Sequence, residues 1–281
     1  MNYIKRVRLT SNIAGSFKYF ILILSTLVSL YPIFWVVMSG FKTTSEIYTN
    51  TLNLPQNWIM ENYKKVLTSP NLLLGFYNSF VTAFGVLLIG TIIGSMAAYV
   101  SSRLMKSGLL HTYFALGIMI PMHSILIPTF HIMKNFGMLY TRHGIILAYI
   151  ASTLPITVFI LHGFMKGIPH EMEEAAIIDG CTRTRTFFSI IMPMSKSGIA
   201  TILTLNVLSV WNDFLFSLII GGQKYFNITV VINNFHMDSD NITNYALICA
   251  GITFSILPLA IMYLALQEHV IRGIAEGAIK A

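Results

Sequence analysis

A few polar side chains interrupt the long apolar stretches of this chain, and they are the first candidates for chemistry. Asn206, Trp211, Asn212 and Asp213 fall in one apolar stretch, and Asn78 opens another. Polar groups inside membrane-spanning segments are costly and are therefore functional candidates. Amide and carboxyl groups beside an indole ring suit hydrogen bonding and stacking against a hydroxyl-rich solute. The same tryptophan suits an anchor at the membrane interface, so both interpretations stay open.

Histidines are the other chemical candidates, because imidazole is a common metal ligand. His170-Glu171 begins like a zinc-protease motif, but no second histidine follows at the required spacing. Four of the six histidines within residues 111–170 fall near the ends of apolar stretches, where packing or interfacial roles are expected. We therefore expect no metal site and no catalytic residue, and an intramembrane metalloenzyme is a weak alternative. The six are His111, His123, His131, His143, His162 and His170.

The polar segment Gly167–Pro193 reads GIPHEMEEAAIIDGCTRTRTFFSIIMP and predicts two short helices. Pro169 suits the first position of a helix, and the acidic residues that follow favour the helix dipole. Gly180 suits the left-handed residue that ends a helix, and Thr182 can cap the next one. Pro193 marks where the second helix ends and the chain returns to the membrane.

One face of the first predicted helix is narrow and carries small side chains. Met172, Ala175, Ala176 and Asp179 share this face, because they recur at helical spacing. Glu171, Glu174 and Ile178 line an adjacent stripe. Small side chains let the backbone of another protein approach closely, so the helix is predicted to dock against a cytoplasmic partner. A helix lying on the lipid surface is the alternative, although its glutamates would oppose anionic headgroups.

The composition predicts the elements that carry these residues. The 281 residues are 55% hydrophobic and 10% charged, with a mean hydropathy of +0.69. A membrane-spanning helix needs about 20 apolar residues, and six stretches qualify. We therefore expect an all-α integral membrane protein with one domain over 1–281 and a cytoplasmic loop at 166–196. The predicted spans are 19–38, 76–100, 110–130, 144–165, 198–220 and 245–267.

The lysines and arginines predict the orientation of these spans. Twelve of the 18 lie at the termini and in the loops after the second and fourth spans. Positive residues accumulate in cytoplasmic loops, so both termini and the loop 166–196 are predicted to be cytoplasmic. This asymmetry accounts for the net charge of +7, and attraction to anionic lipid requires no nucleic-acid partner.

Prolines and glycines predict how the spans bend and pack. Pro121, Pro128 and Pro155 each remove a backbone hydrogen bond and are expected to kink the third and fourth spans. Gly90 and Gly94 stand four residues apart on the second span, a spacing typical of closely packed membrane helices.

The loop resembles that of permease subunits of bacterial ABC importers. The family pattern is E-A-A-x-x-D-G followed by a small residue, then eight residues of any type, then I-x-(L/M)-P. The loop matches this pattern, with Cys181 and Met192 as mild departures. Further blocks resemble the carbohydrate-uptake permeases, above all the maltose-type second subunit. They include 31–43, 97–104, 119–128 and 211–214. The matched loop positions are Glu174, Ala175, Ala176, Asp179, Gly180, Ile190 and Pro193.

This resemblance implies a fold and a set of partners. The fold would be the six-helix, MetI-like permease fold of type I ABC importers in the bacterial cytoplasmic membrane. A second permease, two cytoplasmic ATPases and an external sugar-binding protein would complete the transporter, with a carbohydrate as substrate. The outer loop 221–244 would reach the binding protein, and the ATPases would bind ATP, so this chain would need no cofactor. The tail residues Gly277, Ala278 and Lys280 would touch the ATPases.

Two other transport functions remain as alternatives. An ABC permease for a non-sugar solute would share the same loop. A stand-alone secondary transporter is disfavoured, because no internal repeat or buried charge pair offers an ion-coupling site. The chain also lacks the G-x-x-x-x-G-K-[ST] loop that binds ATP, so its energy source must be another protein.

Overall fold

The computed structural model is helical over most of the residues it describes, which are 2–105, 108–234 and 243–279 for the backbone. Side chains are described within these ranges from residue 17 to residue 265, and at Gln267. The chain divides into two compact units, 1–69 with 235–254 and 70–234 with 255–281. The expectation of a single domain over 1–281 stays a prediction.

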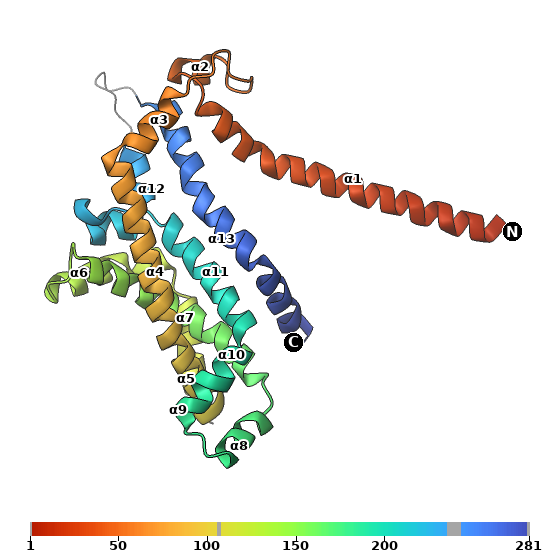
Figure 1. The fold of residues 1–281 in the computed structure, drawn as a ribbon, viewed down its shortest axis with the longest axis vertical. Helices are drawn as coiled ribbons and strands as arrows, with labels where there is room; N and C mark the ends of the chain where they lie inside the picture. Colours follow the sequence, from red (N-terminus) through yellow and green to blue (C-terminus); the bar gives the residue numbers. More distant parts are fainter. Residues whose placement is uncertain (1, 106–107, 235–242, 280–281) are drawn as a thin grey trace. The chain divides into compact units, whose positions relative to one another are not determined.

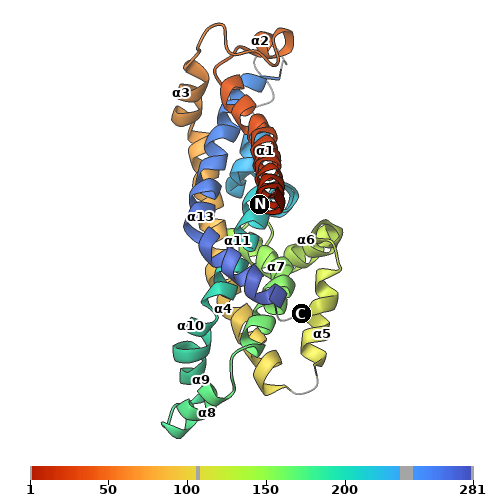
Figure 2. The same cartoon turned by 90° about the vertical axis from the view of Figure 1, so that its right-hand side faces the viewer.

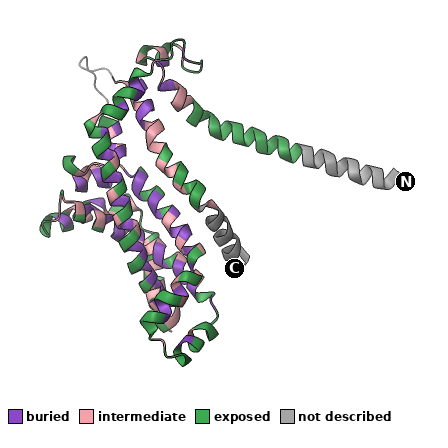
Figure 3. Cartoon of the chain, in the orientation of Figure 1, coloured by how far each residue is buried: buried purple, intermediate pink, exposed green. Residues whose placement is uncertain are grey.

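The first unit holds α1 (Asn2–Ser39), α2 (Thr44–Thr49), α3 (Glu61–Thr68) and the beginning of α13 (Tyr245–Ile279). Side chains 17–34 of α1 are exposed, and burial begins only at its end, from residue 35 (Figure 3). The loop after α1 is ordered by buried polar groups: the Nζ of Lys42 donates to the Asn50 carbonyl at 2.8 Å, and Asn62 donates to the carbonyls of Gly40 and Lys42.

The second unit is built around three helices that run side by side: α4 (Pro70–Tyr99), α7 (Arg142–Lys166) and α11 (Lys196–Asn212) (Figure 1). Gly94 is buried, and a Cβ added there would collide with the methyl group of Thr157 on α7. The nearest atom to a Cβ at Gly90 is Cγ1 of Ile150, also on α7, at 3.7 Å. The predicted role in close helix packing is confirmed for Gly94, whereas a Cβ at Gly90 would make an ordinary van der Waals contact.

Two pairs of consecutive helices are joined by sharp bends, the first within the predicted third span and the second within the predicted loop, just before the fifth span. The first pairs α5 (Leu109–Ile118) with η2 (Met122–Ile125) and α6 (Leu126–Asn135), at an angle of 95°. The bend lies at Pro121, where a kink was predicted, but its size makes this a broken helix. The second pairs α9 (Arg183–Thr186), η3 (Phe187–Ile191) and α10 (Met192–Met194) with α11, at 75°.

Among the described residues, four helices are long and apolar enough to cross a membrane, and six spans result if each bent pair counts as one. The four cover Phe17–Ser39, Pro70–Leu104, Arg142–Lys166 and Tyr245–Ala265, close to the predicted ranges. The predicted end of the fifth span at residue 220 is wrong for a continuous helix, because α11 ends at Asn212.

The cause of this early end is the side chain of Asp213. Its carboxylate accepts from the backbone N–H of Phe216 at 2.9 Å and of Ser217 at 3.3 Å, so it starts a new turn instead of continuing the helix. The chain then forms η4 (Ser217–Gly221), η5 (Gln223–Tyr225) and α12 (Ile228–Asn233).

Candidate functional site

The predicted docking helix is present as α8 (Glu171–Ile178), and it lies with α9 at one end of the second unit, beyond the ends of α4 and α7 (Figure 2). It begins later than predicted: the N-cap is His170, so Pro169 precedes the helix rather than opening it. The first turn carries Glu171, Glu173 and Glu174, as predicted.

The turn after α8 has the predicted geometry. Gly180 has a φ of +82°, the left-handed conformation that stops a helix. Its N–H donates to the Ile177 carbonyl, and the N–H of Cys181 donates to the Ala176 carbonyl. Thr182 caps α9, because its hydroxyl accepts from the N–H of Arg185 at 3.3 Å. The sequence signals for both helix ends are therefore confirmed.

The predicted face of small residues on α8 is only partly open. Ala176 is buried at 4% exposure, whereas Ala175 and Asp179 are exposed. The correction follows from packing, since α8 contacts α9 and turns Ala176 toward the protein. Apolar side chains are exposed as well, and Ile178 is 84% exposed. Met172 and Ile177 of the same helix are exposed too, at 42% and 53%, and apolar side chains grouped on a short polar loop mark a surface suited to a partner.

The second loop helix leads into an apolar hollow. Pro193 is exposed and Ile190 is half-buried. A pocket of about 370 Å³ lies where α10 meets α11. It is lined by Phe188, Met192, Pro193, Lys196, Ile199, Ala200 and Leu203.

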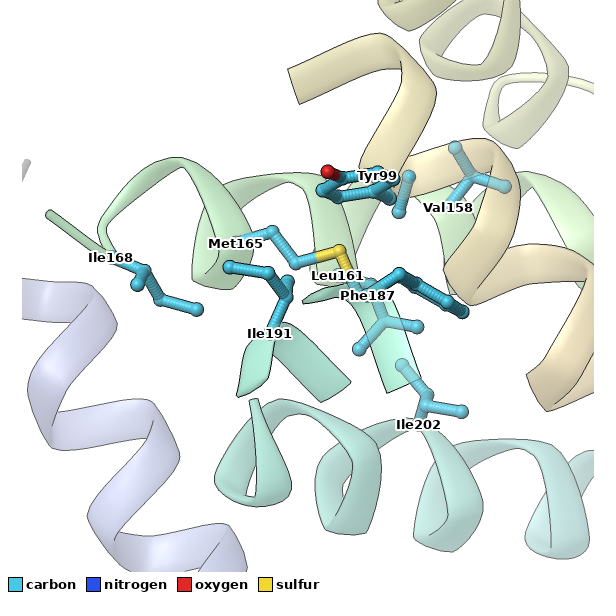
Figure 4. Packing of buried hydrophobic residues seen from close by; sticks show 9 residues of the cluster. Tyr99, Val158, Leu161, Met165, Ile168, Phe187, Ile191 and Ile202 are labelled. Atoms are coloured by element: carbon cyan, nitrogen blue, oxygen red, sulfur yellow. The ribbon is translucent and has the colours of Figure 1, made fainter. Parts of the chain in front are cut away.

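Beneath the loop is a hydrophobic cluster that joins the loop to the long helices (Figure 4). Phe187 and Ile191 of η3 are buried in it, and the rings of Phe187 and Tyr99 lie 5.2 Å apart between centroids. Close packing of this kind transmits displacement, because interiors are dense and poorly compressible. Its labelled members are Tyr99, Val158, Leu161, Met165, Ile168, Phe187, Ile191 and Ile202.

Sequence reasoning missed Arg103, which lies in the π-helical turn η1 (Val100–Leu104) after α4. Its side chain is fully buried, and its Nη2 donates to the carbonyls of Met165 and Ile168. Its Nε lies 3.5 Å from Oε1 of Glu173 on α8. An arginine that follows an apolar span is usually assigned to the surface, so the sequence offered no signal for this contact.

Two of the candidate pathway residues are held in structural hydrogen bonds. The side-chain amide of Asn78 donates to the carbonyls of Lys224 and Phe226, and its Oδ1 accepts from Arg142 at 2.9 Å. Asn206 is buried and donates to the Thr157 hydroxyl at 2.8 Å. These contacts connect α4 and α11 to neighbouring segments of the second unit.

The other three candidates differ in exposure. Trp211 is buried, and its Nε1 donates to the Ser255 carbonyl at 3.2 Å. Asn212 is exposed and bonds its own helix at Leu208. Asp213 is buried, accepts from the Tyr149 hydroxyl at 2.8 Å and lies 3.2 Å from Nε2 of the more exposed His123. The five candidates therefore do not converge on one binding surface, and their pathway role stays a prediction.

Histidines do pair in the second unit, but without the ligands of a metal site. His111 and His162 stack at 4.0 Å between centroids, and Nδ1 of His162 lies 2.9 Å from the Ser101 hydroxyl. No group of three or more His, Cys, Asp or Glu side chains gathers in the part of the chain that the structure describes.

The tail predicted to touch the ATPases cannot be placed in this site. Lys280 lies outside the described residues, as do the side chains near Gly277 and Ala278. Much of the tip of the outer loop 221–244 also lies outside the described residues. Both contacts stay predictions.

Comparison with known proteins decides the family. The model of the binding-protein-dependent transport system inner membrane components matches residues 90–276. The chain belongs to this family. It is a permease component, as the loop pattern predicted, and its curated relatives are transport proteins rather than enzymes.

Two of these permeases align over nearly the whole chain. The diacetylchitobiose uptake system permease protein NgcG of Streptomyces coelicolor is 32% identical over 92% of this chain and 87% of its own length. The probable starch degradation products transport system permease protein AmyC of Thermoanaerobacterium thermosulfurigenes is 34% identical over 94% of this chain and 97% of its own.

Solved structures show that the permease fold is shared. A chain of a bacterial ABC transporter that imports the acidic polysaccharide alginate superposes with a TM-score of 0.78 and 20% identity, over 93% of this chain and 98% of that one. The predicted all-α permease fold is confirmed.

Proposed function

We propose that this permease forms part of the translocation pathway of an ATP-driven sugar importer and receives the force of ATP hydrolysis through the loop 169–193. The observation that carries the proposal is the exposed helix α8, which combines Ile178 and the acidic side chains Glu171 and Glu174 at the end of the second unit. Such a surface fits a cleft on an ATPase with basic side chains.

The substrate class rests on the relatives. NgcG and AmyC are named for uptake of diacetylchitobiose and of starch degradation products, and both align over most of this chain. A carbohydrate is therefore the substrate that we propose here. The exposed Asn212, with the Asp213–His123 pair one residue away, is the part of the candidate pathway best suited to contact hydroxyl groups.

The partners follow from the same proposal. A second permease would complete the pathway, two ATPases would bind ATP on the cytoplasmic side, and a sugar-binding protein would deliver the substrate outside. The charge distribution supports cytoplasmic termini and a cytoplasmic α8. An alginate ABC transporter has been solved with an oligosaccharide-bound periplasmic protein, and its chain shares this fold at a TM-score of 0.67 and 15% identity.

The test replaces one exposed glutamate at a time. Glu174→Ala removes a carboxylate from the first turn of α8, and Glu61→Ala removes a matched, exposed one from the first turn of α3. Losing one side of an ion pair that docking buries costs about 2–5 kcal/mol. We expect Glu174→Ala alone to lower ATPase co-purification and sugar uptake. Equal behaviour of the two variants in both assays would contradict the proposal.

A further inference from the structure

The side chain of Arg103 joins three segments that the coupling proposal needs to move together. It follows α4, it bonds the end of α7 through the Met165 carbonyl, and it bonds the α7–α8 connection through the Ile168 carbonyl. Its Nε also lies 3.5 Å from Glu173 on α8. One guanidinium can serve several acceptors because its donors form a rigid, planar fork.

The contact has a chemical reason at each end. The last carbonyls of a helix lack partners within the helix and carry partial negative charge, so a cation at the end of α7 is favourable. Glu173 differs from the neighbouring glutamates, because its side chain is only 13% exposed while Glu171 and Glu174 face solvent. α8 therefore directs one carboxylate toward the buried arginine and two away from it.

Burial makes the pair sensitive to the loss of either member. The Arg103 side chain is 0% exposed, and a buried charge without its counterion is strongly unfavourable. Nε and Nη1 of Arg103 and Oε1 of Glu173 have no hydrogen-bond partner among the described residues, so the buried charge depends on the two carbonyls and on the 3.5 Å ion pair with Glu173.

We propose that Arg103 is a positioning residue that latches the docking helix α8 to the ends of α4 and α7. The latch makes the loop move as one body with the spans instead of as a free tether. Its importance for transport rests on the proposed coupling function, but the latch itself does not.

A native cysteine near the end of α8 allows opening of this latch to be measured. Cys181 follows Gly180 at the end of α8 and is half-buried, whereas the second cysteine, Cys249, is buried. With Cys249→Ala as the common background, the rate of thiol labelling of Cys181 reports opening of the loop. The measurement uses inside-out vesicles containing the assembled transporter, before and after the peripheral ATPase is stripped, so that ATPase shielding is separated from loop mobility.

We expect Arg103→Met to label about tenfold faster in stripped vesicles, which corresponds to a fall of about 1.4 kcal/mol in the free energy of local opening. Arg103→Lys keeps the charge but not the fork, so an intermediate rate is expected. Glu173→Gln should accelerate labelling as well, and adding it to Arg103→Met should change little further, because neighbours that act together are not additive. Arg185→Gln removes an exposed positive charge from the same loop and should label like the parent.

Wild-type labelling in both Arg103→Met and Glu173→Gln would overturn the latch. Equal acceleration by Arg185→Gln would also overturn it, since the effect would then be one of general charge near the thiol. Faster labelling only in the latch variants supports the latch, even if uptake and ATPase stimulation stay unchanged. Unchanged uptake and ATPase stimulation in those variants would instead contradict the coupling function proposed for the loop.

Discussion

Gly180 offers a graded test of the turn that ends α8. Its φ of +82° is one that L residues rarely adopt, and no heavy atom lies within 4 Å of a Cβ placed there. A substitution therefore causes backbone strain without a steric clash. That strain is about 1–2 kcal/mol for an ordinary L residue, and a β-branched residue is disfavoured further. Since 1.4 kcal/mol is a factor of ten, Gly180→Val should reduce the population of the native turn by roughly tenfold or more.

The expected order of function is Gly, Asn, Ala, Val, because asparagine tolerates the left-handed region better than other non-glycine residues. The assays are co-purification of the ATPase and sugar uptake by the same vesicles, with the amount of inserted permease as a control. Uptake at the parental rate in Gly180→Val, with the ATPase still bound, would refute the reasoning that this turn sets the position of α8.

Three further predictions concern packing, the polar residues and orientation. Gly94→Ala should lower the melting temperature of the purified complex, because overpacking against Thr157 costs about 1–3 kcal/mol, whereas Gly163→Ala on α7 meets no atom within 4 Å and should not. Asp213→Ala should lower the melting temperature of the complex, because it leaves the Tyr149 hydroxyl without its acceptor. Asn212→Ala should instead lower sugar uptake at an unchanged melting temperature. The reverse pattern would contradict a structural role for Asp213 and a pathway role for Asn212. In intact cells an impermeant thiol reagent should label Lys224→Cys and spare Cys181, and labelling of Cys181 from outside would contradict the orientation.

Much of the helical framework follows from the sequence, because the length and apolarity of a span are local properties. The ends of α7 and the end of α4 agree with expectation to within two residues, α4 begins earlier than expected, at Pro70, and the signals at Gly180 and Thr182 are confirmed. These features depend on backbone conformation and on hydrogen bonds between near neighbours in sequence, which residue types specify directly.

Features that depend on distant partners were missed. Pro121 predicted a kink, but a bend of 95° also requires the packing of α5 against α7. Asn78 is fully engaged with Lys224, Phe226 and Arg142, contacts that no local pattern specifies.

Burial within the loop was missed for the same reason. Ala176 and Arg103 both face the protein interior, although helical spacing and charge placed them at the surface. Contacts between residues far apart in sequence decide which side chains are buried in the protein and which stay exposed to a partner or a solute.

The central claim is that α8 docks on an ATPase, and crosslinking from its most exposed large apolar side chain tests this most directly. Ile178 is 84% exposed, so a photoreactive residue placed there should disturb the fold little. In the intact transporter we expect an ultraviolet-dependent crosslink to the ATPase, and its yield should change when ATP and loaded binding protein are added. The same residue at Ile33, an exposed position of α1, is the control and should give none. Crosslinking from Ile178 to lipid alone, with the ATPase bound and active, would contradict the account.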